Sequence, residues 1–322
     1  MKDARQIKMR LSAKPGIVVI GELNVDLLAS GLTDPPSMGD EILAKDFEVV
    51  LGSASAIFAT GIRKLGYEVT FVSQVGRDQF GDFCVDALRA AGISTKQVSR
   101  RRNLKTGVTI SLSGARDRAL VTYPGAIATF SAEQVPSDSF QNGQHLHMTS
   151  YFLQTALKPS FAEIFRQARK RGLTTSFDPN SDPSGAWGKE IWDVLRETDV
   201  LFLNEREALK LTRTRTIKSA AIKLGQQTNC VVIKLGSKGA VAIKGGELVT
   251  APGFKIKVVD TTGAGDSFDA GFMSGYLAGS SLTECLKIAN ACGAMSALKS
   301  GGSAGQPDQN SLNKFLRSQS QH

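Results

Sequence analysis

Short β-branched apolar runs alternate with longer amphipathic runs along most of this 322-residue chain. The short runs predict strands buried on both faces, and the runs with apolar positions three or four apart predict helices. The predicted strands are 17–20, 69–74, 145–149, 174–178, 200–204, 231–235 and 254–259. The predicted helices are 54–65, 80–91, 160–171, 191–197, 205–211, 217–226 and 267–278. This order predicts an α/β fold with a mostly parallel sheet covered by helices on both faces.

Two segments interrupt the alternation. Residues 26–51 have no helical pattern, and residues 107–126 form two alternating runs around a polar turn at 114–118, as a hairpin does. We expect these two insertions to form a small β-sheet that projects over the active site as a lid.

The alternating pattern is continuous enough to predict a single domain over residues 17–310. Residues 1–16 and 317–322 lack it and are expected to be flexible ends.

Composition narrows the class of protein. The chain is 41% hydrophobic and 21% charged, which is ordinary for a soluble globular protein. No apolar run approaches the roughly 20 residues that cross a bilayer, so no membrane association is expected. Four scattered cysteines with apolar neighbours are typical of reduced thiols in a cytoplasmic protein.

The net charge of +9 raises the question of nucleic acid binding. The densest basic runs, 100–102 and 169–171, are not interleaved with aromatic residues, so we expect no nucleic acid partner. A basic surface equally suits a nucleotide or a phosphorylated product.

The most informative segment runs from Asp260 to Asp266. Its small residues Gly263, Ala264 and Gly265 can turn their backbone N–H groups towards one point at the start of a helix, where an anion is favoured. An acid beside such a nest, Asp266, is placed to accept a proton from a hydroxyl that attacks a phosphoryl group. The simpler alternative is that Asp266 only caps the helix.

Polar or small residues follow other predicted strands. The amide of Asn24 and the carboxylate of Asp26 can clamp neighbouring sugar hydroxyls, although an Asx-turn explains the same pair. Gly52 and Ser53 bring small residues to a helix start, which permits a ligand to approach the backbone or the helix to pack closely.

Asn204 and Glu207 have two interpretations. Because they are three residues apart at a helix start, they can hold Mg²⁺ through water molecules, or they can form a capping box.

A glycine-bounded turn joins two further strands at Lys234, Gly236, Ser237 and Gly239. It lacks the Gly-Lys-Ser/Thr ending of a Walker loop. It is therefore either a plain hairpin turn or one wall of a nucleotide groove. The small-residue helix around Asn290 can pack on a flat base.

Together, in order and spacing, these motifs resemble the ribokinase-like PfkB carbohydrate kinases from about Ile17 to Pro307. The most specific match is 260–266, which corresponds to the C-terminal signature of that family. The supporting matches are 24–26, Gly52 with 65–66, 76–78 with Gly81, 204–207, 234–239, Asn290 and 301–302.

The resemblance implies a three-layer α/β/α fold and an ATP-dependent kinase that phosphorylates a primary hydroxyl of a small sugar or sugar derivative. It implies that Asp266 is the catalytic base and that Gly263, Ala264 and Gly265 form the anion hole. The implied sugar ligands are Asn24, Asp26, Gly52 and Ser53 with Asp266. The implied nucleotide side is Asn204, Lys234, Gly236, Ser237, Gly239, Gly265 and Asn290.

The resemblance also implies Mg²⁺ at Asn204 and Glu207, through water, and a monovalent cation, K⁺, near Asp260, Thr262 and Gly301. An exposed apolar face on the lid would favour a homodimer. A nucleoside kinase of the adenosine-kinase kind and a non-catalytic sugar-binding regulator remain alternatives.

Two departures from the family pattern concern the acceptor. Ser53 replaces the second of two glycines, and Ile57 stands where an asparagine that contacts the sugar is usual. Asp178 and Asn180 match a motif of some members, but Asp182 replaces its arginine. The last change weakens the prediction of an acidic sugar such as ketodeoxygluconate.

Overall fold

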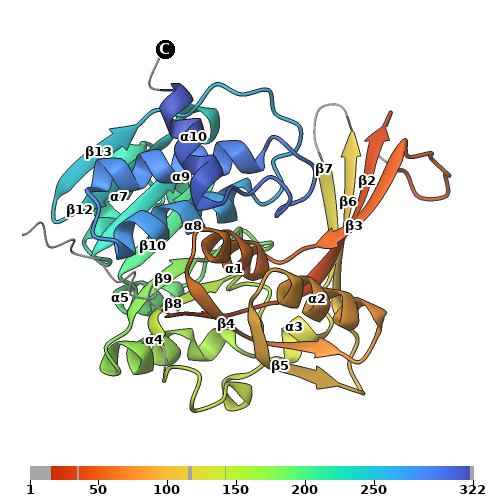
Figure 1. Ribbon diagram of the computed structural model, residues 1–322. Helices are drawn as coiled ribbons and strands as arrows, with labels where there is room; N and C mark the ends of the chain where they lie inside the picture. Colours follow the sequence, from red (N-terminus) through yellow and green to blue (C-terminus); the bar gives the residue numbers. More distant parts are fainter. Residues whose placement is uncertain (1–15, 35, 115–117, 142, 320–322) are drawn as a thin grey trace, which may run out of the picture.

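The main sheet of the computed structural model has nine strands in the order β13-β12-β11-β10-β9-β8-β1-β4-β5 (Figure 1). The structure describes residues 16–34, 36–114, 118–141 and 143–319. Every neighbouring pair from β11 to β5 is parallel, and β12 and β13 add an antiparallel edge. The strands are β1 (Gly16–Ile20), β4 (Glu68–Gly76), β5 (Ser94–Arg101), β8 (Gly143–Thr149), β9 (Thr174–Asp178), β10 (Val200–Asn204), β11 (Cys230–Lys234), β12 (Ala240–Lys244) and β13 (Glu247–Ala251).

Helices cover both faces of this sheet, as predicted. Parallel strands buried on both sides are continuous apolar runs rather than alternating ones, and here they supply two separate cores. On one face pack α1 (Ala54–Lys64), α2 (Gln79–Ala90), α8 (Ala264–Leu277) and α9 (Leu282–Ser296). On the other face pack α4 (Phe161–Lys170), α5 (Ile191–Arg196), α6 (Glu205–Thr212) and α7 (Ile217–Gly225). The three-layer α/β/α prediction is therefore confirmed.

A second sheet, in the order β3-β2-β6-β7, stands beside the main body (Figure 1). Its strands are β2 (Asn24–Leu32), β3 (Asp46–Leu51), β6 (Gly107–Gly114) and β7 (Arg118–Tyr123). Strands β6 and β7 pair antiparallel, so the hairpin prediction is confirmed, although residues 115–117 of its turn lie outside the described residues. The two predicted insertions do join in one small sheet, through the parallel pair β2–β6.

Short elements complete the chain. They are α3 (Ala126–Thr129), α10 (Gln309–Gln319) and the 3₁₀ turns η1 (Ala132–Gln134), η2 (Lys158–Ser160) and η3 (Gly236–Lys238). Within the described ranges, no helix is long and apolar enough to span a bilayer.

One predicted strand is wrong. Residues 254–259 have a strand-like pattern, but they form an irregular segment without a sheet partner, and Val258 and Val259 are exposed. The pattern misleads because this segment lines a cleft instead of joining the sheet edge at β13. The helix that follows starts at Ala264, three residues before the predicted start at Ser267.

The predicted ends also differ from the structure. Gly16 already belongs to β1, and residues 317–319, expected within a flexible end, belong to α10. Leu312 and Phe315 of α10 pack with Leu65 and Cys292, which explains why the helix continues past the expected domain end at 310. Residues 1–15 and 320–322 lie outside the described residues.

Candidate active site

A cleft of about 680 Å³ opens where β9, β10 and β11 end and α8 begins. Ligands of open parallel sheets bind at this carboxyl edge of the strands. The structure brings eleven of the predicted residues together around the cleft: Asn204, Glu207, Lys234, Gly236, Ser237, Gly239, Gly263, Ala264, Gly265, Asp266 and Asn290.

The first turn of α8 forms the floor of the cleft. Gly263 precedes the helix in a left-handed conformation with φ 67°, and a Cβ there would lie 2.6 Å from Cα of Gly302. Only glycine fits both constraints. Ala264 and Gly265 follow as the first helical residues, so the positive end of the helix dipole faces the cleft. Asp266 lies in the same turn and also lines the cleft.

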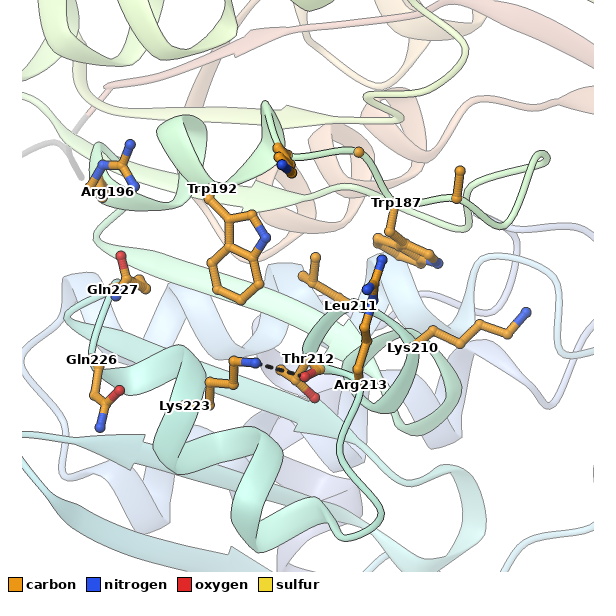
Figure 2. A pocket seen from close by; sticks show the side chains of 13 residues that line it. Trp187, Trp192, Arg196, Lys210, Leu211, Thr212, Arg213, Lys223, Gln226 and Gln227 are labelled. Atoms are coloured by element: carbon orange, nitrogen blue, oxygen red, sulfur yellow. Dashed lines mark hydrogen bonds between the residues drawn. The ribbon is translucent and has the colours of Figure 1, made fainter.

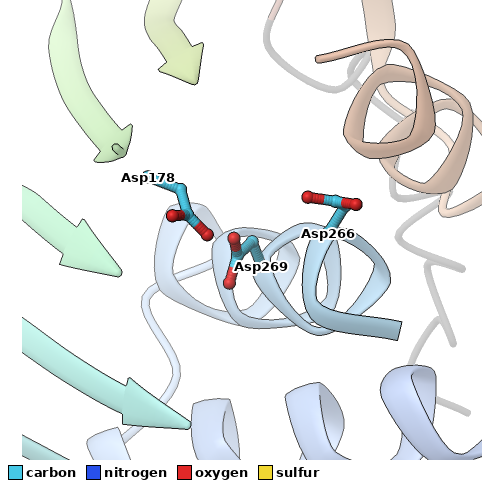
Figure 3. A group of neighbouring side chains, drawn as sticks. All are labelled: Asp178, Asp266 and Asp269. Atoms are coloured by element: carbon cyan, nitrogen blue, oxygen red, sulfur yellow. The ribbon is translucent and has the colours of Figure 1, made fainter. Parts of the chain in front are cut away.

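A buried group of charges lies beside Asp266 and involves three separate elements. The ammonium of Lys234, at the end of β11, lies 2.6 Å from Oδ2 of Asp178, at the end of β9. The same ammonium is 3.1 Å from both carboxylate oxygens of Asp269, one helical turn after Asp266. Figure 3 shows Asp178, Asp266 and Asp269 grouped at the start of α8.

The three carboxylates of Asp178, Asp266 and Asp269 are close enough together to bind a metal ion. However, the Lys234 ammonium already lies between two of them. Burial opposes its charge, but Asp178 and Asp269 outweigh burial and raise the pKa of Lys234. This lysine is therefore a fixed cation that neutralises the pair, and a metal ion there would have to displace it.

The electrostatic environment makes Asp266 a weak acid. Burial, assisted by the negative charges of Asp178 and Glu22 and opposed by Lys234, raises the pKa of Asp266 to about 7. A carboxyl group with this pKa is close to half ionised at neutral pH. It can accept a proton and release it again in that range, unlike an ordinary aspartate.

Asn204 and Glu207 form the predicted capping box at the start of α6. The Asn204 N–H donates to Glu207 Oε2 over 2.9 Å, and the Glu207 N–H donates to Asn204 Oδ1 over 2.9 Å. The hydroxyl of Ser181 donates to the other Glu207 oxygen over 2.8 Å. Burial, together with the charge of Asp178, raises the pKa of Glu207. Both oxygens already accept hydrogen bonds, so this pair suits a hydrated cation better than direct coordination.

The turn after β11 forms one side wall of the cleft. It contains η3 and packs against residues 252–253, because a Cβ at Gly253 would lie 2.5 Å from the Ser237 carbonyl oxygen. Gly239 has φ 101°, and a side chain there would overlap the carbonyl of Ala251. On the facing helix α9, the amide of Asn290 donates to the carbonyls of Ala251 and Pro252 over 3.2 and 3.1 Å. Asn290 therefore fixes the segment that forms this wall.

Asn24, Asp26 and Gly52 lie together at the base of the second sheet. The amide of Asn24 donates to Asp26 Oδ1 over 2.8 Å, and a Cβ at Gly52 would overlap that carboxylate. Burial, against the opposing hydrogen bond from Asn24, raises the pKa of Asp26 to about 6. Asn24, Asp26 and Gly52 do not line the cleft.

Ser53 has the left-handed backbone conformation of the glycine that it replaces, with φ 71°. Its hydroxyl donates to the Glu22 carbonyl over 2.6 Å and accepts from the Ala56 N–H over 2.9 Å. The side chain therefore points inward and caps α1. Ile57, at the usual asparagine position, is buried against Gly263 and Gly302.

Asp260, Thr262 and Gly301, predicted to lie near a monovalent cation, are in contact. Asp260 Oδ1 accepts from the Thr262 N–H over 2.9 Å, and Oδ2 accepts from the Gly301 N–H over 3.0 Å. The guanidinium of Arg118, from β7 of the second sheet, donates to the Thr262 hydroxyl over 2.7 Å. These contacts link the second sheet to the start of α8.

Sequence reasoning missed three side chains of the candidate site. Asp269 carried a signal, because it lies three residues after Asp266 on the same helix face. Asp178 was noted only as part of a motif, and nothing local indicated that it pairs with Lys234. Arg118 lines the cleft from the second sheet, which no local pattern indicated.

The comparisons with known proteins give the family of this chain and its fold. The profile of the pfkB family carbohydrate kinases matches residues 14–309. A 2-dehydro-3-deoxygluconokinase of Bacillus subtilis is 32% identical over 287 residues, 85% of this chain and 88% of that protein. A ribokinase of Haemophilus influenzae is 26% identical over 310 residues, 93% of this chain and 98% of that protein.

A solved structure of Arabidopsis thaliana ribokinase, complexed with ribose and ATP, has the same fold. It superposes with a TM-score of 0.83 at 27% identity and covers 94% of this chain and 99% of that chain. The ribokinase-like fold predicted from the sequence is therefore confirmed.

The charge group predicts a large stability loss when Lys234 is removed. Lys234→Met leaves Asp178 and Asp269 buried without a cation, and we expect the free energy of unfolding at pH 8 to fall by about 3–5 kcal/mol. Urea denaturation at pH 8 measures the free energy of unfolding of the variant and of the unmodified protein. The matched control is Lys238→Met, because Lys238 is 75% exposed and only 4.0 Å from Glu205. We expect that variant to lose less than about 1 kcal/mol. Equal losses in the two variants would contradict the account of the network.

Proposed function

Because the chain belongs to the pfkB family of carbohydrate kinases, we propose that it transfers the γ-phosphoryl group of ATP to a primary hydroxyl of a small sugar or sugar derivative. In this reaction the acceptor oxygen bonds to the γ-phosphorus and the bond from that phosphorus to the β–γ bridging oxygen breaks. The hydroxyl proton passes to Asp266, and ADP leaves.

The observation that carries the proposal is the position and pKa of Asp266. Its carboxyl group lines the cleft in the first turn of α8, and burial raises its pKa to about 7. A general base works best when its pKa is near the working pH, because it is then both ionised and basic enough. An exposed aspartate, with a pKa near 4, would be a much weaker base.

The anion hole is the second part of the proposal. Gly263 caps α8, and Ala264 and Gly265 begin it beside Asp266, where the positive end of the helix dipole favours negative charge. Charge that develops on the transferred phosphoryl group would be stabilised there. The absence of side chains at Gly263 and Gly265 lets the phosphate approach the backbone.

ATP would bind between the turn at Gly236–Gly239 and helix α9. The wall built from Ser237, Gly253 and Asn290 is held by close backbone packing and by the hydrogen bonds of the Asn290 side chain to two backbone carbonyls. The Arabidopsis ribokinase structure is complexed with ATP, which supports ATP as the phosphoryl donor.

Asn204 and Glu207, which line the cleft, would hold Mg²⁺ by way of its water shell. Bound there, the ion would neutralise phosphate charge.

K⁺ is proposed at Asp260, Thr262 and Gly301, beside the anion hole. Asp260 joins the loop before α8 to the loop at Gly301 by accepting hydrogen bonds from both. Carbonyl and carboxylate oxygens in such a junction suit a hard cation. The cation would stiffen the loop that sets the position of Gly263.

The sugar would lie between Asp266 and the pair Asn24–Asp26, under the second sheet acting as a lid. The backbone at Gly52 and Ser53 completes this side, since the Ser53 hydroxyl is engaged with Glu22. Arg118 reaches from the lid to Thr262, so the lid and the anion hole already contact each other. Closure over the sugar would exclude water and limit hydrolysis of ATP.

Two features bear on the acceptor class. Asp182, which replaces an expected arginine, accepts from the Ser184 and Trp187 N–H groups and is used to hold a turn. Arg118 nevertheless places a cation at the cleft, which suits an acidic sugar. The similarity to a 2-dehydro-3-deoxygluconokinase makes a sugar acid the first acceptor to test. The ribose in the Arabidopsis complex makes a pentose the second.

We propose that the protein is a homodimer in the cytoplasm. All four cysteines are buried and unpaired, as expected for a reducing compartment. The second sheet exposes Phe47, Leu120, Val121 and Tyr123, an apolar face that a second copy could cover.

An acceptor panel tests the proposed reaction. ADP release would be followed with ATP, Mg²⁺ and K⁺ against sugars, sugar acids and nucleosides, and we expect one sugar or sugar acid to respond strongly. A strong response to adenosine alone would instead indicate a nucleoside kinase. Silence across the panel, with sugar binding still seen by calorimetry, would indicate a non-catalytic regulator.

Replacing the base gives the second test. Asp266→Asn keeps the shape of the side chain but cannot accept the proton, so we expect kcat to fall by at least about 10²–10⁴-fold. Calorimetry should show ATP and acceptor binding within a few-fold of the unmodified enzyme. Asp193→Asn, on the surface of α5, is the matched control and should keep full activity. Retained activity in Asp266→Asn, or loss of both binding and turnover, would exclude Asp266 as the base.

A further inference from the structure

A second cavity, of about 570 Å³, lies between the C-terminal end of α6, helix α7 and the segment that leads into α5 (Figure 2). No residue lines both this cavity and the active-site cleft. Its volume falls in the range of small-molecule sites. None of the reaction steps proposed above uses it.

The lining of this cavity is positively charged. It includes five basic side chains and no carboxylate: Lys189, Arg196, Lys210, Arg213 and Lys223. Arg196 forms an ion pair with Asp193. In the described part of the chain, no carboxylate lies within ion-pair distance of the other four. The cavity therefore concentrates positive charge, although Lys223 also donates to the Thr212 carbonyl over 2.9 Å.

The cavity also contains both tryptophans of the chain. Trp187 and Trp192 line it, and the sequence has no others. Figure 2 shows Trp192 in the middle of the cavity, with Lys223 below it and Arg213 reaching towards Trp187. The Lys223 ammonium lies 5.9 Å from the centre of the Trp192 ring. Flat aromatic rings beside cations suit a ligand with a flat ring and a negative group.

Two residues that line this cavity have a positive φ angle. Trp187 has φ 55°, a left-handed conformation that non-glycine residues rarely adopt, whereas Arg213, with the same φ, is the left-handed cap that ends α6. Among the described residues only Ser53, Ser150 and Asn180 share it, and these lie near the active site: Asn180 lines the cleft and accepts a hydrogen bond from Ser150. Such strain persists where the surroundings hold it, and it is concentrated at ligand sites.

We propose that this cavity binds a nucleoside monophosphate. The base would stack on the indole of Trp192, which is only partly buried, and the phosphate would pair with Lys210 and Arg213 at the end of α6. Arginine and lysine are the usual partners of a phosphate, and an indole is the usual partner of a base. The proposal does not depend on the reaction assigned to the cleft.

Two elements connect the cavity to the cleft. Helix α6 begins at Asn204 and Glu207 in the cleft and ends beside Lys210 and Arg213 in the cavity. The segment after β9 starts with Asp178 in the cleft and reaches the cavity at Trp187, with Asp182 holding the turn through the Trp187 N–H. Ligand contacts with Arg213 and Trp187 would act on both elements, so occupancy should alter the KM for ATP.

Tryptophan fluorescence tests the binding, because both fluorophores line the cavity and neither lines the cleft. The full-length chain would be titrated with AMP and with UMP, and with inorganic phosphate and adenosine as partial ligands. We expect saturable quenching by at least one monophosphate, and much weaker binding of phosphate or adenosine alone.

Charge reversal locates the site. In the double variant Lys210→Glu, Arg213→Glu, the apparent Kd should rise at least about tenfold, as expected from the loss of one charge-assisted hydrogen bond. The double variant Arg215→Glu, Lys218→Glu changes the net charge equally on neighbouring residues outside the cavity, and should bind within about twofold of the unmodified chain.

Two results would overturn the proposal. One is the absence of saturable quenching with both monophosphates at millimolar concentration, and the other is an equal loss of affinity in the two double variants. In steady-state assays, the monophosphate should change the KM for ATP of the unmodified enzyme but not of the Lys210→Glu, Arg213→Glu variant. An effect that persists in that variant would assign it to competition in the cleft and refute the coupling.

Discussion

The ion pair of Lys234 with Asp178 and Asp269 is the interaction on which the site depends. It joins the ends of β9 and β11 to the first turns of α8 at the carboxyl edge of the sheet. Buried ion pairs stabilise little by themselves, because desolvation offsets most of the attraction. Their effect here is one of placement, since they hold negative and positive charge at fixed positions next to Asp266. Burial is the main cause of the raised pKa of Asp266, while in the charge group Lys234 opposes the rise and Asp178 adds to it.

Three glycines also help to position the site, because they allow close approaches that a side chain would block. Gly263 approaches the backbone of Gly302, Gly52 leaves room for the carboxylate of Asp26, and Gly239 lets its turn approach Ala251. Each glycine lacks a side chain at a point where its backbone lies against another backbone segment or against a carboxylate. At Gly263 and Gly239, which line the cleft, its walls are therefore formed by close backbone contacts. The second sheet contributes Arg118, which ties the lid to Thr262.

Local patterns predicted the fold well where strands are buried on both faces. Residues 174–178 and 200–204 are strands with the predicted bounds, because continuous apolar runs leave little choice of element. The same pattern failed at 254–259, where β-branched residues line a cleft without a sheet partner. The site residues of the glycine-rich signature could be predicted, since their chemistry is local. The partners of Lys234 and the second basic cavity could not, because separate segments meet there only in the folded chain.

The central claim is that burial, balanced by the charges of Lys234, Asp178 and Glu22, sets the pKa of Asp266 for its role as base. The measurement that tests it is the pH dependence of kcat/KM for the acceptor at saturating ATP and Mg²⁺. We expect activity to fall below a midpoint near pH 7, because protonated Asp266 cannot accept a proton, and to level off above it. Glu22 contributes to the raised pKa, so Glu22→Gln should move the midpoint to lower pH. A profile without this acidic limb, or a limb that stays in place in Glu22→Gln, would contradict the account.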